Sequence, residues 1–176
     1  GILALAMIHV MAEENLIDAA FVREWTNGPF LVRNDNQQLL TARDISADGD
    51  AGTFLVWDDR GNNLVRYHAD RGYARDDIAP ALSGSHAVRM TDGTIIECRP
   101  ALAHLTRIAE AYAPEQTEQI TGVPAQHVRR AVRLFAAEKP SCYYSWNGIE
   151  QHSDATQTNR ALCILYALTG QFDERG

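Results

Sequence analysis

The residue types best suited to contact a ligand stand together between Asn147 and Ser153. Gly148 has no side chain, so a ligand can approach its backbone closely. Gln151 and His152 carry an amide and an imidazole, which form hydrogen bonds. A helix is expected to follow, and its first N–H groups offer unpaired donors and a partial positive charge to an anion. The turn therefore indicates a ligand-binding site, with a hydrogen bond from His152 to a neighbouring carbonyl group as the open alternative.

No other part of the sequence carries a recognisable catalytic or metal-binding motif. The patterns G-x-x-x-x-G-K-[ST], H-E-x-x-H, G-x-S-x-G and G-x-G-x-x-G are all missing. Gly84-Ser85-His86 places a base directly beside a serine, which is not how catalytic triads assemble. The three cysteines are widely spaced and odd in number, and we interpret them as small buried residues. We assign no catalytic residue and no metal ligand within the chain.

A short strand and a long helix are expected to hold the turn. Residues 142–144, Cys-Tyr-Tyr, form a β-prone run, and an apolar stripe at helical spacing begins after Asp154. The members of the stripe are Ala161, Leu162, Ile164, Leu165 and Leu168. Ser153 or Asp154 can cap this helix, and Gly170 suits the left-handed position after its end. In an open α/β sheet, ligands bind at the carboxyl ends of the strands, which is where this turn would lie.

Helices are also predicted near both ends of the chain. The dense apolar run at residues 2–14 predicts a buried helix, and Asp18 is expected to cap a short second helix. Helical spacing returns after residue 100, and Pro124 suits the first position of a later helix. That helix carries an arginine run, Arg129, Arg130 and Arg133. The run is either an exposed helix face or a phosphate site.

The middle of the chain has a sequence pattern typical of short strands and turns. Between residues 30 and 98, short β-prone runs are separated by Asp, Asn and Gly, with hairpins expected at residues 58–63 and 91–93. The order of helices and strands predicts an α/β fold: one Rossmann-like layered domain over residues 1–176 with a small β-hairpin-rich insertion at 30–98.

The composition is that of an ordinary folded domain. The chain has 176 residues, of which 45% are hydrophobic and 22% charged, enough to bury a substantial core. A formal net charge of −7 argues against a nucleic-acid partner, since phosphate contacts need clustered Lys and Arg. The apolar run at residues 1–11 is too short to span a bilayer and lacks the basic leader of a signal peptide. We expect a soluble protein without membrane insertion, and the sequence does not distinguish a cytoplasmic from a periplasmic location.

Three blocks of the sequence form a recognisable set. The first is the opening, GILALAMIHVMAEENLIDAAFVREWTNG. The second, from Ile120 to Ala136, reads I-T-G-V-P-A-x-x-V-R-R-A-x-R-L-F-A, and the third combines G-I-E-Q-H with N-R-A and L-T-G-x-F-D-x-x-G. Together they resemble the molybdopterin oxidoreductases of the dimethyl sulfoxide reductase and formate dehydrogenase family. Members of that family are several times longer, so the resemblance implies an internal fragment.

The resemblance implies a cofactor and residues that contact it. The cofactor would be molybdopterin guanine dinucleotide with molybdenum or tungsten, which carries the redox chemistry of the parent enzyme. By this resemblance Gly148, Gln151 and His152 contact the cofactor. Weaker assignments to the same role are Trp146, Asn147, Glu150 and Gln157. Alternatively, Trp146 is a residue of the hydrophobic core. Arg160 would face either a phosphate or an acidic neighbour.

The same resemblance places the other functional parts outside the chain. The metal ligand, any iron–sulfur cluster and the domain that closes on the second pterin would lie elsewhere in the parent. We therefore expect this fragment to be inactive alone. Its expected partners are the remaining domains of the parent, an electron-transfer subunit and a small-molecule substrate. The alternative function is a free-standing α/β nucleotide-binding or interaction module without redox chemistry.

Overall fold

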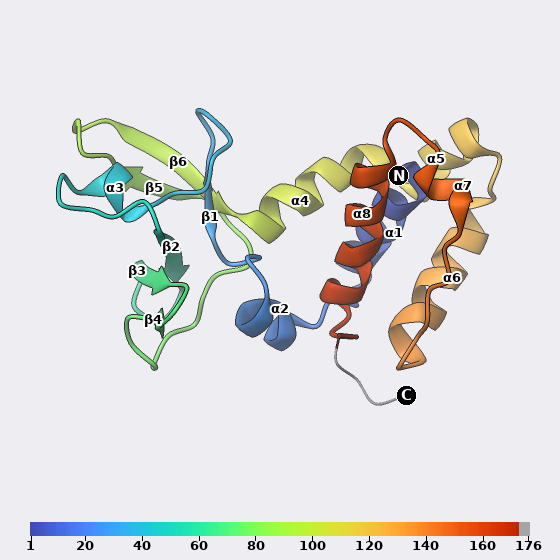
Figure 1. Cartoon of the computed structure of the whole chain (residues 1–176), viewed down its shortest axis with the longest axis horizontal. Helices are drawn as coiled ribbons and strands as arrows, with labels where there is room; N and C mark the ends of the chain where they lie inside the picture. The colour runs from blue at the N-terminus through green and yellow to red at the C-terminus, as the bar shows by residue number, and fades with distance from the viewer. Residues whose placement is uncertain (173–176) are drawn as a thin grey trace. The chain divides into compact units, whose positions relative to one another are not determined.

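The computed structural model describes residues 1–172, and its chain divides into two compact units. Unit 1 is formed by Gly1–Glu24 together with the chain from Thr106 onward, and unit 2 by Trp25–Leu105. Within residues 1–172, every strand belongs to unit 2, and the candidate turn belongs to the helical unit 1 (Figure 1).

Unit 1 is built around the apolar helix α1 (Ile2–Glu13). Two further helices, α2 (Ala19–Trp25) and α4 (Ala101–Ala109), begin or end in unit 2. The remaining elements of unit 1 are the 3-10 helix η1 (Glu110–Tyr112), α5 (Pro114–Thr121), α6 (Ala125–Ala137), α7 (Asn147–Glu150) and α8 (Ala155–Leu168). Helix α1 packs against α5, α6 and α8, and Ala6, Ile8, Val10 and Met11 are fully buried. A helix that is apolar around its circumference is stable only when it is enclosed. The predicted buried helix is confirmed.

Two residues predicted to end or begin helices of unit 1 occupy those positions. The carboxylate of Asp18 accepts the N–H of Phe21 at 3.0 Å and so caps α2. Gly170 follows α8 with φ of +65°, a left-handed conformation that glycine adopts without strain. A Cβ added there would also lie 2.8 Å from Oδ2 of Asp18. The positive φ is the main reason for glycine at this position, because the Asp18 carboxylate is the end of a flexible side chain that can shift.

Unit 2 contains two small antiparallel sheets. One has the strand order β1-β6-β5, and the other β2-β3-β4. The elements are β1 (Leu31–Arg33), α3 (Ala42–Ile45), β2 (Thr53–Asp58), β3 (Asn63–His68), β4 (Gly72–Tyr73), β5 (His86–Arg89) and β6 (Ile95–Pro100). Both predicted hairpins are present, with Asp58 opposite Asn63 and Arg89 opposite Ile95.

The core of unit 2 is formed by side chains that alternate along its strands. Leu31, Leu55 and Cys98 belong to one buried cluster, and Phe30 and Val56 to a second. Adjacent residues of β2 thus point into different clusters, as the two-residue period of a strand requires. Because both faces of β2 pack against apolar clusters, Phe54 to Trp57 form a continuous apolar run.

Asp58, at the end of β2, is a buried carboxylate that organises a loop of unit 2. It accepts the N–H groups of Ala79 at 2.9 Å, Arg60 at 3.1 Å and Gly61 at 3.1 Å, and it pairs with Arg75. The N–H of Ala79 first, and then these other donors, hold the pKa of the Asp58 carboxyl below its ordinary value. The carboxylate therefore joins the β2–β3 turn to the loop around residues 75–79.

We predict that this loop is acid-sensitive through Asp58. A carboxylate whose folded-state pKa is lowered adds stability above its unfolded-state pKa of about 4, and loses it as pH falls through the folded-state value. The Asp58→Asn variant should therefore open more readily than the wild type at pH 7. Hydrogen exchange of amides 75–81 in the full-length protein measures this difference, which should shrink as the pH falls below about 4 and through the lowered folded-state pKa of Asp58. A difference that stays constant as the pH falls would contradict the prediction.

The strand predicted at residues 142–144 is not formed within residues 1–172. This segment is extended but has no strand pairing, and Tyr144 is 93% exposed. A strand needs a neighbour for its N–H and C=O groups, and the described residues place none beside it. The described strand pairs are all antiparallel. The fold is therefore mixed α and β, and the parallel layer of a Rossmann-like fold is not seen in these residues.

Candidate functional site

The residues predicted to contact a cofactor, apart from Gln157 in the first turn of α8, lie around the short helix α7. They are Trp146 before the helix, Asn147, Gly148 and Glu150 within it, and Gln151 and His152 after it. The helix is a single turn, in which the N–H of Gln151 donates to the carbonyl oxygen of Asn147 at 3.1 Å. The carbonyl oxygen of His152 then accepts the N–H of Ala155, the first residue of α8, at 3.1 Å. The sequence thus located one continuous, locally folded segment.

The surface of this segment is open rather than filled by the protein's own side chains. All the predicted contact residues are exposed, including Trp146 at 83%. The alternative that Trp146 lies in the core is therefore wrong within the described structure. A Cβ added at Gly148 would meet no atom within 4 Å. Packing within residues 1–172 thus gives no reason for glycine at this position.

The polar side chains of the segment are also free to bind a ligand. No hydrogen bond or ion pair within residues 1–172 uses the side chains of Gln151 or His152, so the carbonyl alternative for His152 is not realised there. Arg160 is exposed one helical turn further on, and no acidic side chain of the described chain pairs with it. Unpartnered donors on an exposed turn can bind a polar ligand without first breaking internal bonds.

Two helix N-termini meet beside this segment. Asp154 occupies the N-cap position of α8 and Gly1 that of α1, and neither makes a side-chain capping hydrogen bond. A Cβ on Gly1 would lie 3.3 Å from Oγ1 of Thr158 and 4.0 Å from Oδ2 of Asp154. The predicted cap is therefore correct in position but lacks its bond. The starts of α1 and α8 thus lie at the same end of unit 1, where the helix dipoles place partial positive charge.

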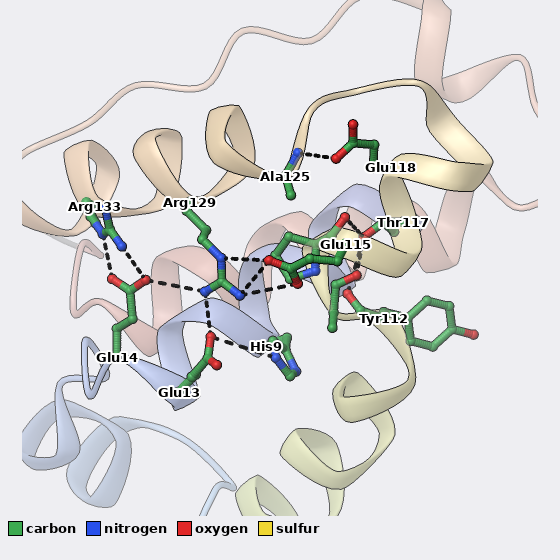
Figure 2. Close-up of polar contacts among 12 residues, drawn as sticks. His9, Glu13, Glu14, Tyr112, Glu115, Thr117, Glu118, Ala125, Arg129 and Arg133 are labelled. Carbon is green, nitrogen blue, oxygen red and sulfur yellow. Dashed lines mark hydrogen bonds and ion pairs between the residues drawn. The ribbon is translucent and has the colours of Figure 1, made fainter.

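The arginine run of α6 is occupied by carboxylates instead of forming a phosphate site. Arg129 donates to Glu13 at 2.5 Å and to Glu115 at 3.0 Å, and Arg133 donates to Glu14 at 2.7 Å (Figure 2). The hydrogen bond from Arg133 holds the pKa of Glu14 below its ordinary value. These pairs join α1, α5 and α6 at the unit surface, where each contributes little to stability. The exposed-face interpretation is confirmed for Arg130 and Arg133, whereas Arg129 is partly buried, with 23% of its side chain exposed.

A second polar hollow lies in unit 2 and was not predicted. It has a volume of about 510 Å³ and is lined by charged residues of both signs. Arg33, the partly buried charge of the hollow, already pairs with Asp35 and Asp44. The hydrogen bond to Asp35 chiefly raises the pKa of the Arg33 guanidinium. Because its partly buried Arg33 is already paired with two carboxylates, this hollow gives weaker support for an anionic ligand than the turn at α7.

One buried polar side chain below the candidate site was also missed by the sequence. Gln171 is only 7% exposed, and its amide bonds to the backbone of two distant segments. It stands at the variable position of the L-T-G-x-F-D pattern, directly after Gly170. The sequence carries no signal of this burial, because Gln171 stands among residues of mixed polarity.

Comparisons with known proteins identify relatives over the whole chain. Perchlorate reductase subunit alpha of Dechloromonas aromatica is 32% identical over 203 residues, covering 100% of this chain and 22% of that protein. Dimethylsulfide dehydrogenase subunit alpha of Rhodovulum sulfidophilum is 32% identical over 179 residues, covering 99% and 19%. Formate dehydrogenase H of Escherichia coli is 39% identical over 64 residues, covering 36% of this chain and 9% of that protein. No family model matches the chain.

The relatives are reductases and dehydrogenases, which places the chain in the broad class of oxidoreductases. Within that class, the chain belongs to the molybdopterin oxidoreductase family. It spans between 19% and 22% of the length of the first curated relatives that it matches. The resemblance read from the sequence motifs is confirmed, and the chain corresponds to one part of these longer proteins. No helix within residues 1–172 combines the length and apolar character needed to cross a membrane.

Proposed function

We propose that this chain is part of the catalytic subunit of a molybdenum- or tungsten-dependent oxidoreductase. Its role there is to form part of the surface that binds molybdopterin guanine dinucleotide. The observation that carries the proposal is the open turn from Trp146 to His152, which lies at the start of α8 beside the start of α1. Family membership supplies the identity of the ligand class.

The chemistry of this surface fits a dinucleotide. The start of α8, whose N-cap residue makes no side-chain capping bond, provides N–H donors and partial positive charge, both of which favour a diphosphate. The exposed guanidinium of Arg160 adds a full positive charge on the first turns of α8. Asp154 provides an acceptor for ribose hydroxyl or guanine amino groups, a role that carboxylates near a nucleotide often take. Donors and acceptors are thus both present for the parts of such a ligand.

Each residue of the turn has a distinct role in the proposal. Gly148 lets the ligand approach the backbone, and Gln151 and His152 hydrogen-bond it, while Asn147 and Glu150 stand at the margin of the contact. Trp146 offers an exposed ring on which a flat heterocycle can stack. The bound cofactor supplies the two-electron chemistry, and these residues bind and orient it.

The extended segment before α7 supports a further part of the proposal. Between residues 141 and 145 the described backbone forms no hydrogen bond to another backbone group, so its N–H and C=O groups can pair with a strand of the parent chain. Such pairing would place α8 against a parallel layer and complete a Rossmann-like arrangement with the β-rich residues 30–98 inserted in it. The rest of the parent chain is then the first partner of this fragment.

The proposal assigns the remaining functions to the rest of the parent. A metal ligand, any iron–sulfur cluster, the contacts to an electron-transfer subunit and the pocket for a small-molecule substrate all lie outside these residues. The fragment alone is therefore proposed to be inactive.

The proposal is tested by analysing the full-length protein purified without oxygen. We predict close to one molybdenum or tungsten per protein, with a fluorescent pterin and a guanine nucleotide released by acid. Protein that contains neither metal nor pterin would overturn the proposal and favour a binding module without redox chemistry. Pterin released without a guanine nucleotide would exclude the dinucleotide form.

A further inference from the structure

Gln171 is the one buried amide side chain within residues 1–172, and it connects three segments of unit 1. Its Oε1 accepts the N–H of Ser141 at 2.8 Å. Its Nε2 donates to the carbonyl oxygen of Phe135 at 2.9 Å and to Oγ1 of Thr169 at 2.9 Å. The amide therefore joins the last turn of α6, the end of α8 and the start of the extended segment.

The surroundings of Gln171 leave it few alternative arrangements. Thr169 is fully buried, and its hydroxyl donates to the carbonyl oxygen of Leu165 at 2.9 Å. Both N–H bonds of the Gln171 amide and one lone pair of its oxygen are thus used. A buried network with every member satisfied holds its parts in one geometry, because any shift leaves a desolvated polar group unpaired. The position of Ser141 is fixed by this network.

Ser141 is the residue from which the chain runs toward the candidate site. From there to residue 145 the described backbone makes no hydrogen bond to another backbone group. The side-chain hydroxyl of Ser141 adds a bond to the carbonyl oxygen of Glu138 at 2.8 Å, within the same corner. On the other side of the turn, α8 provides a rigid anchor. The bond from Ser141 to Gln171 is therefore the main polar anchor on the near side of the segment that leads to α7.

We propose that Gln171 is a positioning residue for the cofactor site. It fixes the point at which the extended segment leaves α6, and through that segment it sets the placement of Trp146 and Gly148 relative to the start of α8. Gln171 itself is buried and does not contact the ligand. This inference rests on the proposed function, because it assumes that the α7 turn binds the cofactor.

The test compares two buried polar substitutions in the full-length protein. Gln171→Met keeps the volume of the side chain but removes all three hydrogen bonds. The matched control is Thr117→Val, which removes another buried hydroxyl of unit 1, one that donates to the carbonyl oxygen of Ala113 at 2.8 Å in α5. We expect Gln171→Met to lower metal and pterin content roughly tenfold, the usual effect of losing a supporting hydrogen bond around a cofactor. Thr117→Val should retain its cofactor.

Hydrogen exchange separates positioning from general destabilisation. The amide of Ser141, whose N–H donates to Oε1 of Gln171, should exchange faster in Gln171→Met than in the wild type, while those of α5 and α1 remain protected. Equal cofactor loss in Gln171→Met and Thr117→Val, or equal loading and equal exchange in Gln171→Met and the wild type, would overturn the inference.

A second variant and the wild-type protein complete the design. Ser141→Pro removes the N–H that donates to Gln171 and leaves Gln171 itself in place. This variant should also contain less cofactor than the wild type, and it tests the same hydrogen bond if Gln171→Met does not accumulate. Normal loading of Ser141→Pro would overturn the inference. A wild-type protein without cofactor would instead defeat the proposed function, and the exchange of the Ser141 amide would still decide whether Gln171 anchors the segment.

Discussion

Full-length protein carrying Gly148→Val should contain roughly 10- to 100-fold less cofactor than the wild type, with its folding unchanged. The magnitude follows from the about 1–3 kcal/mol cost of forcing extra methyl groups into a close contact. Within residues 1–172 nothing lies within 4 Å of a Cβ at Gly148, so a side chain there meets solvent until the ligand binds. The measurement is metal and pterin content beside thermal unfolding.

The matched control for Gly148→Val is Ala131→Val. Ala131 is an exposed residue of α6 in the same unit, so a valine there adds a similar apolar side chain away from the turn. This control should keep both its cofactor and its melting temperature. Equal cofactor content in Gly148→Val and wild-type protein would show that the ligand does not approach this backbone.

The second large effect is expected from Ile8→Ala in the buried helix α1. Ile8 is completely buried, and α1 is enclosed by α5, α6 and α8. Removal of a large aliphatic side chain from such a core typically costs about 2–5 kcal/mol. The free energy of opening of unit 1, measured by hydrogen exchange of the α1 amides in the full-length protein, should fall by that amount.

Leu3→Ala on the same helix provides the comparison for Ile8→Ala. Leu3 is 37% exposed, so its truncation leaves no enclosed cavity and should change the free energy of opening by less than about 1 kcal/mol. Similar losses in both variants would contradict the enclosed position of α1. Because α1 begins beside Asp154 and Thr158, Ile8→Ala should also reduce cofactor retention.

Features set by neighbours in sequence were predictable. Three such features depend only on residues within a few positions of each other: the apolar run of α1, the cap at Asp18, and the hairpin in which Asp58 pairs with Asn63. The exposed turn at α7 was located in the same way, from a glycine and polar residues before a helix. Local signals therefore identified both the elements and the place to look for a ligand.

Features set by distant residues were not predictable. The partners of Gln171 at Ser141 and Phe135 lie 30 and 36 residues away, and Arg129 meets Glu13 across 116 residues. No periodicity records such pairings. The strand expected at residues 142–144 failed for a related reason, since its side-chain pattern is β-prone but its pairing partner is not among the described residues. A strand forms only when a second segment pairs with it, and the described residues contain only the first of the two.

The exposed aromatic segment before α7 has a practical consequence for anyone producing these residues alone. Tyr144 and Trp146 are 93% and 83% exposed, and they accompany a backbone without sheet partners. Such an edge is a template on which a second molecule can align, and the usual outcome is self-association. The substitution Tyr144→Lys, or a short fused strand that pairs with this segment, should keep the isolated fragment monomeric.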